Sequence, residues 1–189
     1  MSSLLKEIQQ ELRSKFSEQA KATTLKFVPN AVFVYGIRTP VLNEMAKEYK
    51  DGGFELVKEL WMSGAFEEKM IAAKMLGRIC KKDPDAALNL VKYFTKDISD
   101  WAVCDTVGMQ SLKPITKLKQ KEIFSLSKKL LRSKNLWERR LSLVLVEVYT
   151  KDRSFHPEIE KRVKALENDK EYYVKKAVEW INRNLKKGK

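Results

Sequence analysis

Residues 67–76 read EEKMIAAKML, and the pattern of this segment returns along the chain at a step of about 35 residues. Stepping from Lys69 leads to the beginnings of three further expected helices, at Cys104, Arg139 and Lys175. Three residues further on, mostly small or branched side chains recur, at Ala72, Val107, Ser142 and Val178. A repeat of this length, with a short helix and a longer partner in each unit, predicts helix pairs stacked as a solenoid.

Helical patterning covers almost the whole chain. Residues 3–20 carry an apolar stripe at helical spacing, and Thr39 before Pro40 predicts an N-cap and a helix start, as does Asp83-Pro84. Further helices are expected at 54–62, 66–81, 99–110, 117–132, 135–150, 157–167 and 170–186. VFVYGI at 32–37 is the only candidate strand. The sequence therefore predicts an all-α fold, a curved α-helical solenoid of HEAT-like repeats in antiparallel pairs, forming a single domain over residues 1–189.

Composition places the chain among globular proteins of a reducing compartment. Hydrophobic residues make up 43% and charged residues 33% of its 189 residues. The two cysteines are too few for a disulfide framework and lack metal-ligand spacing. The N-terminal residues contain no apolar signal core, and no apolar run is long enough to cross a bilayer. We therefore expect a cytoplasmic protein without a membrane partner.

The positive charge is concentrated in the second half of the chain. Residues 1–100 hold 16 basic and 14 acidic residues, whereas residues 101–189 hold 22 basic and 11 acidic residues. A modest excess would serve as a solubilising surface. An excess this one-sided indicates a surface for a polyanion, with nucleic acid favoured over membrane because no single helix sets its basic residues against an apolar face.

The residue types present exclude several kinds of chemistry. The chain has one histidine, His156, in the loop-like stretch SFHPE, which argues against histidine triads and zinc sites. No glycine-rich phosphate loop is present, and GIRTP at 36–40 has the pattern of a turn followed by a helix start. Any chemistry must come from carboxylates, cationic side chains and aromatic rings, and we expect no metal.

The stretch SDWAVCDTVG at 99–108 places a carboxylate one helical turn after an indole, Asp105 after Trp101. One residue after each of the positions that recur at a step of about 35, the chain has Met70, Asp105, Arg140 and Lys176. Three of the four tryptophans lie within a turn of these positions, at Trp101, Trp137 and Trp180. Stacked repeats align equivalent helix faces, so these side chains are expected to line one groove.

Each of these side chains also has a purely structural interpretation. Trp137 and Trp180 belong to apolar stripes typical of a core, and Trp61 is expected in the core or an interface. Asp105 could be a buried acid paired with Arg140, because a carboxylate within an apolar helix face must be paired or solvated. Both interpretations predict a cation beside Asp105; they differ in whether solvent and nucleic acid can reach it.

Four motifs, in this order and at these separations, resemble the AlkD-like DNA alkylation repair glycosylases. They are GIRTP at 36–40, WAVCD at 101–105, NLWERR at 135–140 and KKAVEWINR at 175–183. The resemblance runs from about Phe27 to Arg183. It implies a curved stack of HEAT-like repeats with a basic concave cleft for duplex DNA. It also implies hydrolytic removal of N3- and N7-alkylated purines without metal or organic cofactor.

The resemblance assigns roles to individual residues. The family's catalytic Trp-x-x-x-Asp pair falls on Trp101 and Asp105, and its second cleft tryptophan falls on Trp180. The arginine that follows this tryptophan falls on Arg183, and the arginine of the family's Trp-x-x-Arg helix falls on Arg140. Further DNA-binding residues are then expected at Lys175, Lys176, Trp137 and Phe27.

This chain departs from the family pattern at three places. Phe27 stands where the family often has a tyrosine, so a hydroxyl contact would be lost. Asp100 precedes Trp101 where the family often has two tryptophans in succession. The chain also ends soon after the helix of Trp180, whereas the resemblance implies further C-terminal helices.

The chemistry of alkylated purines fits such a set of residues. The alkylated base carries a positive charge and leaves as a neutral molecule, so little general-acid assistance is needed. We expect Asp105 to stabilise the sugar cation and to position or deprotonate water, with Trp101 and Trp180 beside the sugar. Phosphate contacts are expected from Arg140, Arg183 and the neighbouring lysines.

Two alternatives belong to other functional classes. One is a non-catalytic helical scaffold that binds DNA or RNA through its basic half, with Asp105 as a structural partner of Arg140. The other is a HEAT-like module that docks an acidic protein. For the repair enzyme a monomer is the expected state, as the default for a solenoid that embraces DNA, and the partner is duplex DNA containing alkylated purines.

Overall fold

The computed structural model describes residues 2–187, and every regular element in this range is helical, which confirms the all-α prediction. Met1 and residues 188–189 of the expected domain lie outside the described residues. The α-helices are α1 Ser3–Ser14, α2 Glu18–Phe27, α3 Thr39–Glu48, α4 Gly53–Met62, α5 Phe66–Ile79, α6 Pro84–Phe94, α7 Trp101–Thr106, α8 Gln120–Leu130, α9 Leu136–Val144, α10 His156–Leu166 and α11 Tyr172–Lys187.

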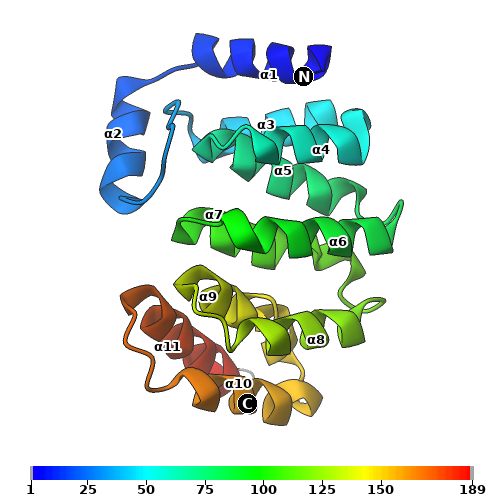
Figure 1. Ribbon diagram of the computed structural model, residues 1–189, viewed down its shortest axis with the longest axis vertical. Coiled ribbons are helices and arrows are strands. Elements are labelled where there is room, and N and C mark those ends of the chain that lie inside the picture. Colours follow the sequence, from blue (N-terminus) through cyan, green and yellow to red (C-terminus); the bar gives the residue numbers. More distant parts are fainter. Residues whose placement is uncertain (1, 188–189) are drawn as a thin grey trace.

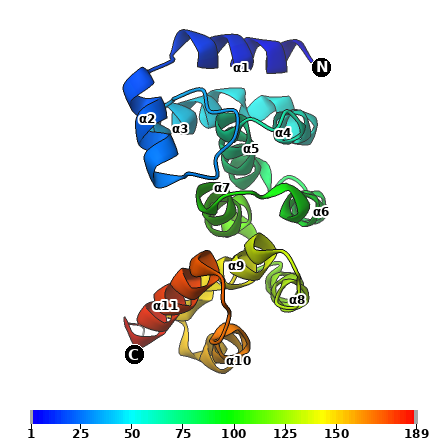
Figure 2. The same ribbon diagram turned by 60° about the vertical axis from the view of Figure 1, so that its left-hand side comes forward.

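The helices stack in two rows (Figures 1 and 2). One row contains α3, α5, α7, α9 and α11, each packed on the next, and we call it the inner row. The other row contains α4, α6, α8 and α10, each beside its inner-row partners. At the level of α7 the inner row is recessed between α2 and α11 (Figure 2). This is the arrangement that the sequence predicts for an α-helical solenoid.

Several local expectations are wrong. The helix expected at 135–150 ends at Val144, and a 3₁₀-helix follows over Glu147–Lys151. Residues 3–20 form two helices because the Ser17 hydroxyl caps α2, accepting from the Ala20 N–H. The N-cap of α3 is Arg38, without a side-chain bond, and Thr39 is already the first helical residue. VFVYGI runs from residue 32 to residue 37 without forming a strand, and none occurs elsewhere in residues 2–187.

The inner helix α7 is short and continues as a π-helix over Val107–Ser111. Two glycines allow this turn to press against its neighbours. A Cβ on Gly108 would lie 2.5 Å from Val144 Cγ1 in α9, and one on Gly77 would lie 2.4 Å from the Gln110 carbonyl oxygen. The widened turn therefore wedges between α5 and α9, and it ends the α-helix earlier than the predicted residue 110.

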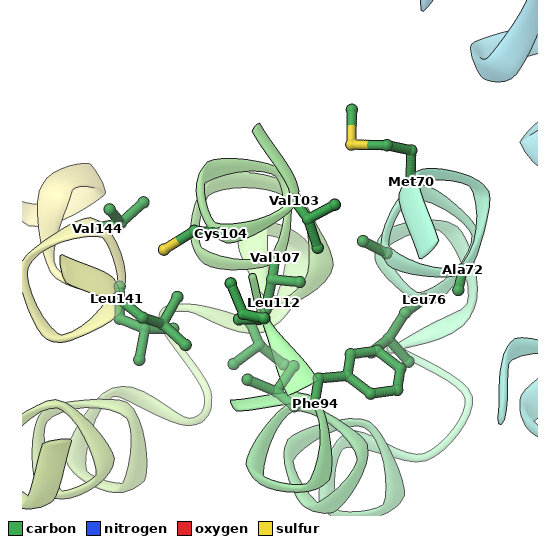
Figure 3. Close-up of a cluster of buried hydrophobic side chains, with 14 of the residues drawn as sticks. Met70, Ala72, Leu76, Phe94, Val103, Cys104, Val107, Leu112, Leu141 and Val144 are labelled. Atoms are coloured by element: carbon green, nitrogen blue, oxygen red, sulfur yellow. The ribbon is translucent and has the colours of Figure 1, made fainter. Parts of the chain in front are cut away.

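The core lies between the two rows and around α7 (Figure 3). Val103, Cys104 and Val107 are fully buried between side chains of α5, such as Leu76, and side chains of α9, such as Leu141. Each apolar side chain buried in this way contributes about 1.5–3 kcal/mol. The recurring positions predicted to be small or branched are all buried, at Ala72, Val107, Ser142 and Val178.

Two further expectations concern buried rings and membranes. Trp61 is in the core, as predicted, stacked on Phe94 with ring centroids 3.8 Å apart. His156 is not in a loop: it is the first residue of α10, is buried, and bonds through Nε2 to the Thr150 carbonyl oxygen. None of the helices in residues 2–187 combines the length and the apolar character needed to cross a bilayer.

Candidate functional site

The N-terminus of α7 is set by Asp100. This residue is 2% exposed, has extended backbone angles, and accepts a hydrogen bond from the Val103 N–H at 2.8 Å through Oδ1. Such a cap satisfies a backbone donor of the first turn. It accounts for the acid that directly precedes Trp101. The cap starts the helix at Trp101 and places Asp105 one turn further along.

The indole of Trp101 is fixed by a backbone contact. The side chain is partly buried against the core, and its Nε1–H donates to the carbonyl oxygen of Phe27 at 2.9 Å. Phe27 is the last residue of α2, so this bond ties the N-terminal end of α7 to α2. The Phe27 ring is 62% exposed, with Lys26 Nζ 5.7 Å from its centroid.

Asp105 and Arg140 form a bidentate pair between α7 and α9. Arg140 Nε donates to Asp105 Oδ1 at 2.9 Å, and Nη2 donates to Oδ2 at 2.8 Å. Nη1 of the same guanidinium donates to the Tyr173 carbonyl oxygen at 2.6 Å, which adds α11 to the cluster. The predicted cation beside Asp105 is thus present, and three consecutive inner-row helices converge on it.

Burial and pairing together shift the pKa values of both partners. Burial raises the pKa of the Asp105 carboxyl above its usual value, although the hydrogen bonds and charge of Arg140 act in the opposite direction. For Arg140, burial acts to lower the pKa, but Asp105 outweighs it and the pKa of the guanidinium is raised. Two donors point at the two carboxylate oxygens, which is the geometry of an ion pair rather than of a neutral acid.

Asp105 is paired but not sealed. Its side chain is 21% exposed, whereas that of Arg140 is 8% exposed. A carboxylate offers about four acceptor positions, and the guanidinium occupies two of them. The remaining positions and the exposed part of the side chain can accept hydrogen bonds from water or a ligand.

The remaining predicted residues on α11 are less closely engaged. Trp180 is partly buried against the core. In the described chain no hydrogen bond or ring contact joins it to Trp101 or Asp105. Lys175, Lys176 and Arg183 are exposed. Lys176 already has two partners within α11: its Nζ lies 3.1 Å from Glu179 Oε2 and 5.7 Å from the Tyr172 ring centroid.

Two residues expected to contact DNA are placed elsewhere. Trp137 is 6% exposed and lies in the core, with its ring centroid 5.0 Å from that of Tyr173, so its groove-lining role is not retained. Arg140 is 7% exposed and its donors are used by Asp105 and the Tyr173 carbonyl, so it is not a free phosphate ligand. Core packing and ion pairing account for these two side chains.

Sequence reasoning missed a buried acid at the start of α5. Glu67 is fully buried, and its carboxylate accepts from the backbone N–H groups of Tyr35, Gly36 and Ile37 at 2.9, 2.7 and 3.1 Å. The neighbouring Glu68 accepts from the Tyr35 hydroxyl at 2.7 Å. The two acids at a helix N-terminus were visible, but nothing in the sequence says that main-chain donors of a distant segment would meet them.

A model of one protein family matches this chain. The family is described as DNA alkylation repair enzyme, and the match covers residues 8–188. No curated protein matches the chain closely enough to be compared with it.

Proposed function

Because the chain belongs to the DNA alkylation repair enzyme family and so has a role in repairing alkylated DNA, we propose that it is a monofunctional DNA N-glycosylase. Its reaction is hydrolysis of the glycosidic bond of N3- and N7-alkylated purines in duplex DNA. It acts as a monomer in the cytoplasm, without a metal or organic cofactor. The observation that carries this proposal is a paired but partly exposed Asp105, held one turn from the anchored indole of Trp101.

The departing base needs little help from the protein, because it does not have to be protonated. An alkylated purine is cationic, so when the C1′–N bond breaks, the electron pair leaves with the base and neutralises it. Positive charge then builds on the deoxyribose, where a carboxylate and aromatic faces stabilise it. Water forms the new C1′–O bond, and its proton passes to a base. A carboxylate is therefore the group that this chemistry needs most.

Asp105 supplies that carboxylate. Its free acceptor positions hold the attacking water or face the sugar, and Arg140 is the positioning residue that fixes the plane of the carboxylate. Trp101, held by the Phe27 carbonyl, forms one wall beside the sugar. Trp180 on α11 forms the facing wall. The exposed cations of α11, Lys175 and Arg183 foremost, hold phosphates.

The test is release of 7-methylguanine and 3-methyladenine from methylated duplex DNA under single-turnover conditions. Asp105→Asn keeps the shape of the side chain but removes its charge. The rate is expected to fall about 10²–10³-fold, the typical cost of losing a preorganised electrostatic group. DNA affinity is expected to persist.

The matched control is Glu160→Gln, which makes the same chemical change at an exposed acid of α10. It should leave the rate unchanged. A wild-type rate in Asp105→Asn would remove this residue from the mechanism.

One observation favours a second candidate, a non-catalytic nucleic-acid-binding scaffold. Both oxygens of Asp105 are already bonded to Arg140, as a structural acid requires. The same assay separates the two candidates, because a scaffold would bind duplex DNA and release no base even from the wild-type protein.

A further inference from the structure

Phe33 is a residue whose position the fold itself does not explain. It is 79% exposed, more than any other large apolar residue in the described chain. Its φ is +51°, and it is the only non-glycine residue there with a positive φ. A bulky side chain disfavours this left-handed conformation, and exposure removes any packing gain. For stability alone, glycine or asparagine would serve better at this position.

The backbone on both sides of Phe33 is held firmly. The carbonyl oxygen of Val32 accepts from the Phe66 N–H at 3.2 Å, at the beginning of α5. Two residues after Phe33, the three consecutive N–H groups bonded to Glu67 begin, and the Gly36 carbonyl oxygen accepts from the Ser17 N–H at 3.2 Å. A strained residue persists only where its surroundings over-determine it. These hydrogen bonds fix the backbone on both sides of Phe33 and so hold the residue in its strained conformation.

The segment that carries Phe33 borders the candidate site. We call residues 28–38 the α2–α3 segment. It begins directly after Phe27, whose carbonyl holds the Trp101 indole, and it bonds to the first residues of α5. In Figure 2 it lies between α2 and the stacked helices α5 and α7. The backbone around Phe33 is therefore bonded to the N-terminal end of α5, and through Phe27 to the N-terminal end of α7, two neighbouring helices of the inner row.

The chain in and around the segment carries a small excess of positive charge, and the two acids that meet the segment, Glu67 and Glu68, are buried. Residues 19–43 contain three basic residues and no acidic one. Other large apolar side chains in this stretch are also exposed, at Leu25, Phe27 and Val32. Exposed rings interleaved with cations bind nucleic acid, because rings stack on bases while the cations meet phosphates.

We propose that the α2–α3 segment is a DNA contact in which the Phe33 ring stacks on a nucleobase beside the alkylated nucleotide and separates it from its neighbour. The inference rests on the proposed function for its choice of duplex DNA, but it does not require cleavage of the glycosidic bond. Stacking of this kind loosens the duplex next to the sugar that Asp105 must reach.

The experiment measures binding without chemistry. All proteins carry Asp105→Asn, and the probe is a methylated duplex with 2-aminopurine beside the lesion. The parent should raise 2-aminopurine fluorescence as the base leaves its stack. Phe33→Gly should weaken binding about 5- to 150-fold, the usual range for loss of one aromatic–base stack, and should abolish the fluorescence rise. Its thermal midpoint should not fall, because glycine adopts a positive φ without strain.

Two further variants and one control test whether the loss comes from the aromatic ring of Phe33 rather than from its backbone. Phe33→Asn also tolerates a positive φ and should reproduce the loss, whereas Phe33→Trp should keep both signals. The control is Tyr93→Ala, which removes an exposed ring from α6, in the other row of helices. It should change neither the affinity for DNA nor the 2-aminopurine fluorescence.

Unchanged affinity and fluorescence in Phe33→Gly would overturn the proposal. So would unchanged DNA binding together with loss of anionic-vesicle binding or of self-association, which would assign the segment to a membrane or to a second copy. If the wild-type protein releases no base while Phe33→Gly still binds duplex DNA poorly, the glycosylase proposal fails and this one stands.

Discussion

Two acids on neighbouring inner-row helices, one fully buried and one partly buried, are satisfied in different ways. Glu67 of α5 is fully buried, and three backbone N–H groups of the α2–α3 segment meet its carboxylate. Asp105 of α7 keeps 21% of its side chain exposed and is paired with a single guanidinium. The first acid closes a segment of main chain onto a helix. The second is held in position while part of it stays accessible.

The difference shows how a stacked fold can bury charge for two purposes. Glu67 is fully buried and bonded to three backbone N–H groups, so its only role is to stabilise the fold. A bidentate arginine fixes Asp105 from one side only and leaves the other side open. Accessibility of the carboxylate, rather than burial of an acid as such, therefore marks the residue suited to chemistry.

The largest expected effect is on stability and comes from Arg140→Ala. Removing the guanidinium leaves a partly buried Asp105 without its partner. Breaking a fully buried pair costs about 3–5 kcal/mol, and because Asp105 is 21% exposed we expect a loss toward or below the lower end of that range. Urea unfolding followed by circular dichroism measures this loss. Arg140→Ala combined with Asp105→Ala should recover part of it, because no unpaired charge then remains. If the double variant is no more stable than Arg140→Ala, the ion pair is not the cause.

A smaller effect is expected from Glu67→Gln. The amide keeps one acceptor oxygen, but its NH₂ group faces a backbone donor, so at least one hydrogen bond is lost at a cost of roughly 1–3 kcal/mol. Glu68→Gln is the matched control in the same helix turn and should cost less, because Glu68 meets side-chain donors only. Equal losses in the two variants would contradict the conclusion that the backbone hydrogen bonds of Glu67 hold the α2–α3 segment on α5.

The smallest expected effect concerns pH. Since burial raises the pKa of Asp105, the rate of base release should fall on acidification at a pH above the ordinary pKa of aspartate. Protonating this group does not unfold the protein. Its contribution to stability is fully present below the unfolded pKa and is lost as the pH rises through the folded pKa.

The measurement is the single-turnover rate against pH, corrected for spontaneous base loss, with circular dichroism on the same samples. The Asp105→Asn profile should be flat in this window. A wild-type rate that holds down to the ordinary pKa of aspartate would contradict the proposed role.

Much of the fold follows from local signals that act over a few residues. The Asp83 cap of α6, the helical stripes and the step of about 35 residues all correspond to observed elements. The errors arise where a contact between elements prevails. Ser17 breaks the first predicted helix while its backbone bonds to Gly36, and the π-helix after α7 forms where glycines admit close neighbours.

The site divides in the same way. The Asp105–Arg140 pair was predictable, because equivalent positions of successive repeats face one another. The anchor of Trp101 was not, since its partner is a backbone carbonyl, and a carbonyl has no signature in the side-chain sequence. The open choice at Trp137 between groove and core was likewise decided only by packing.

By itself, the sequence determined helical periodicity, the repeat length, the surplus of positive charge and the meeting of an acid with an arginine. These depend on spacing along the chain and on residue type. Tertiary structure alone decided which acid stays accessible, that Trp137 lies in the core and not in the groove, and that the Phe33 ring of the α2–α3 segment is exposed. These depend on how main-chain donors and acceptors of distant segments find one another, and every residue except proline carries the same main-chain donor and acceptor.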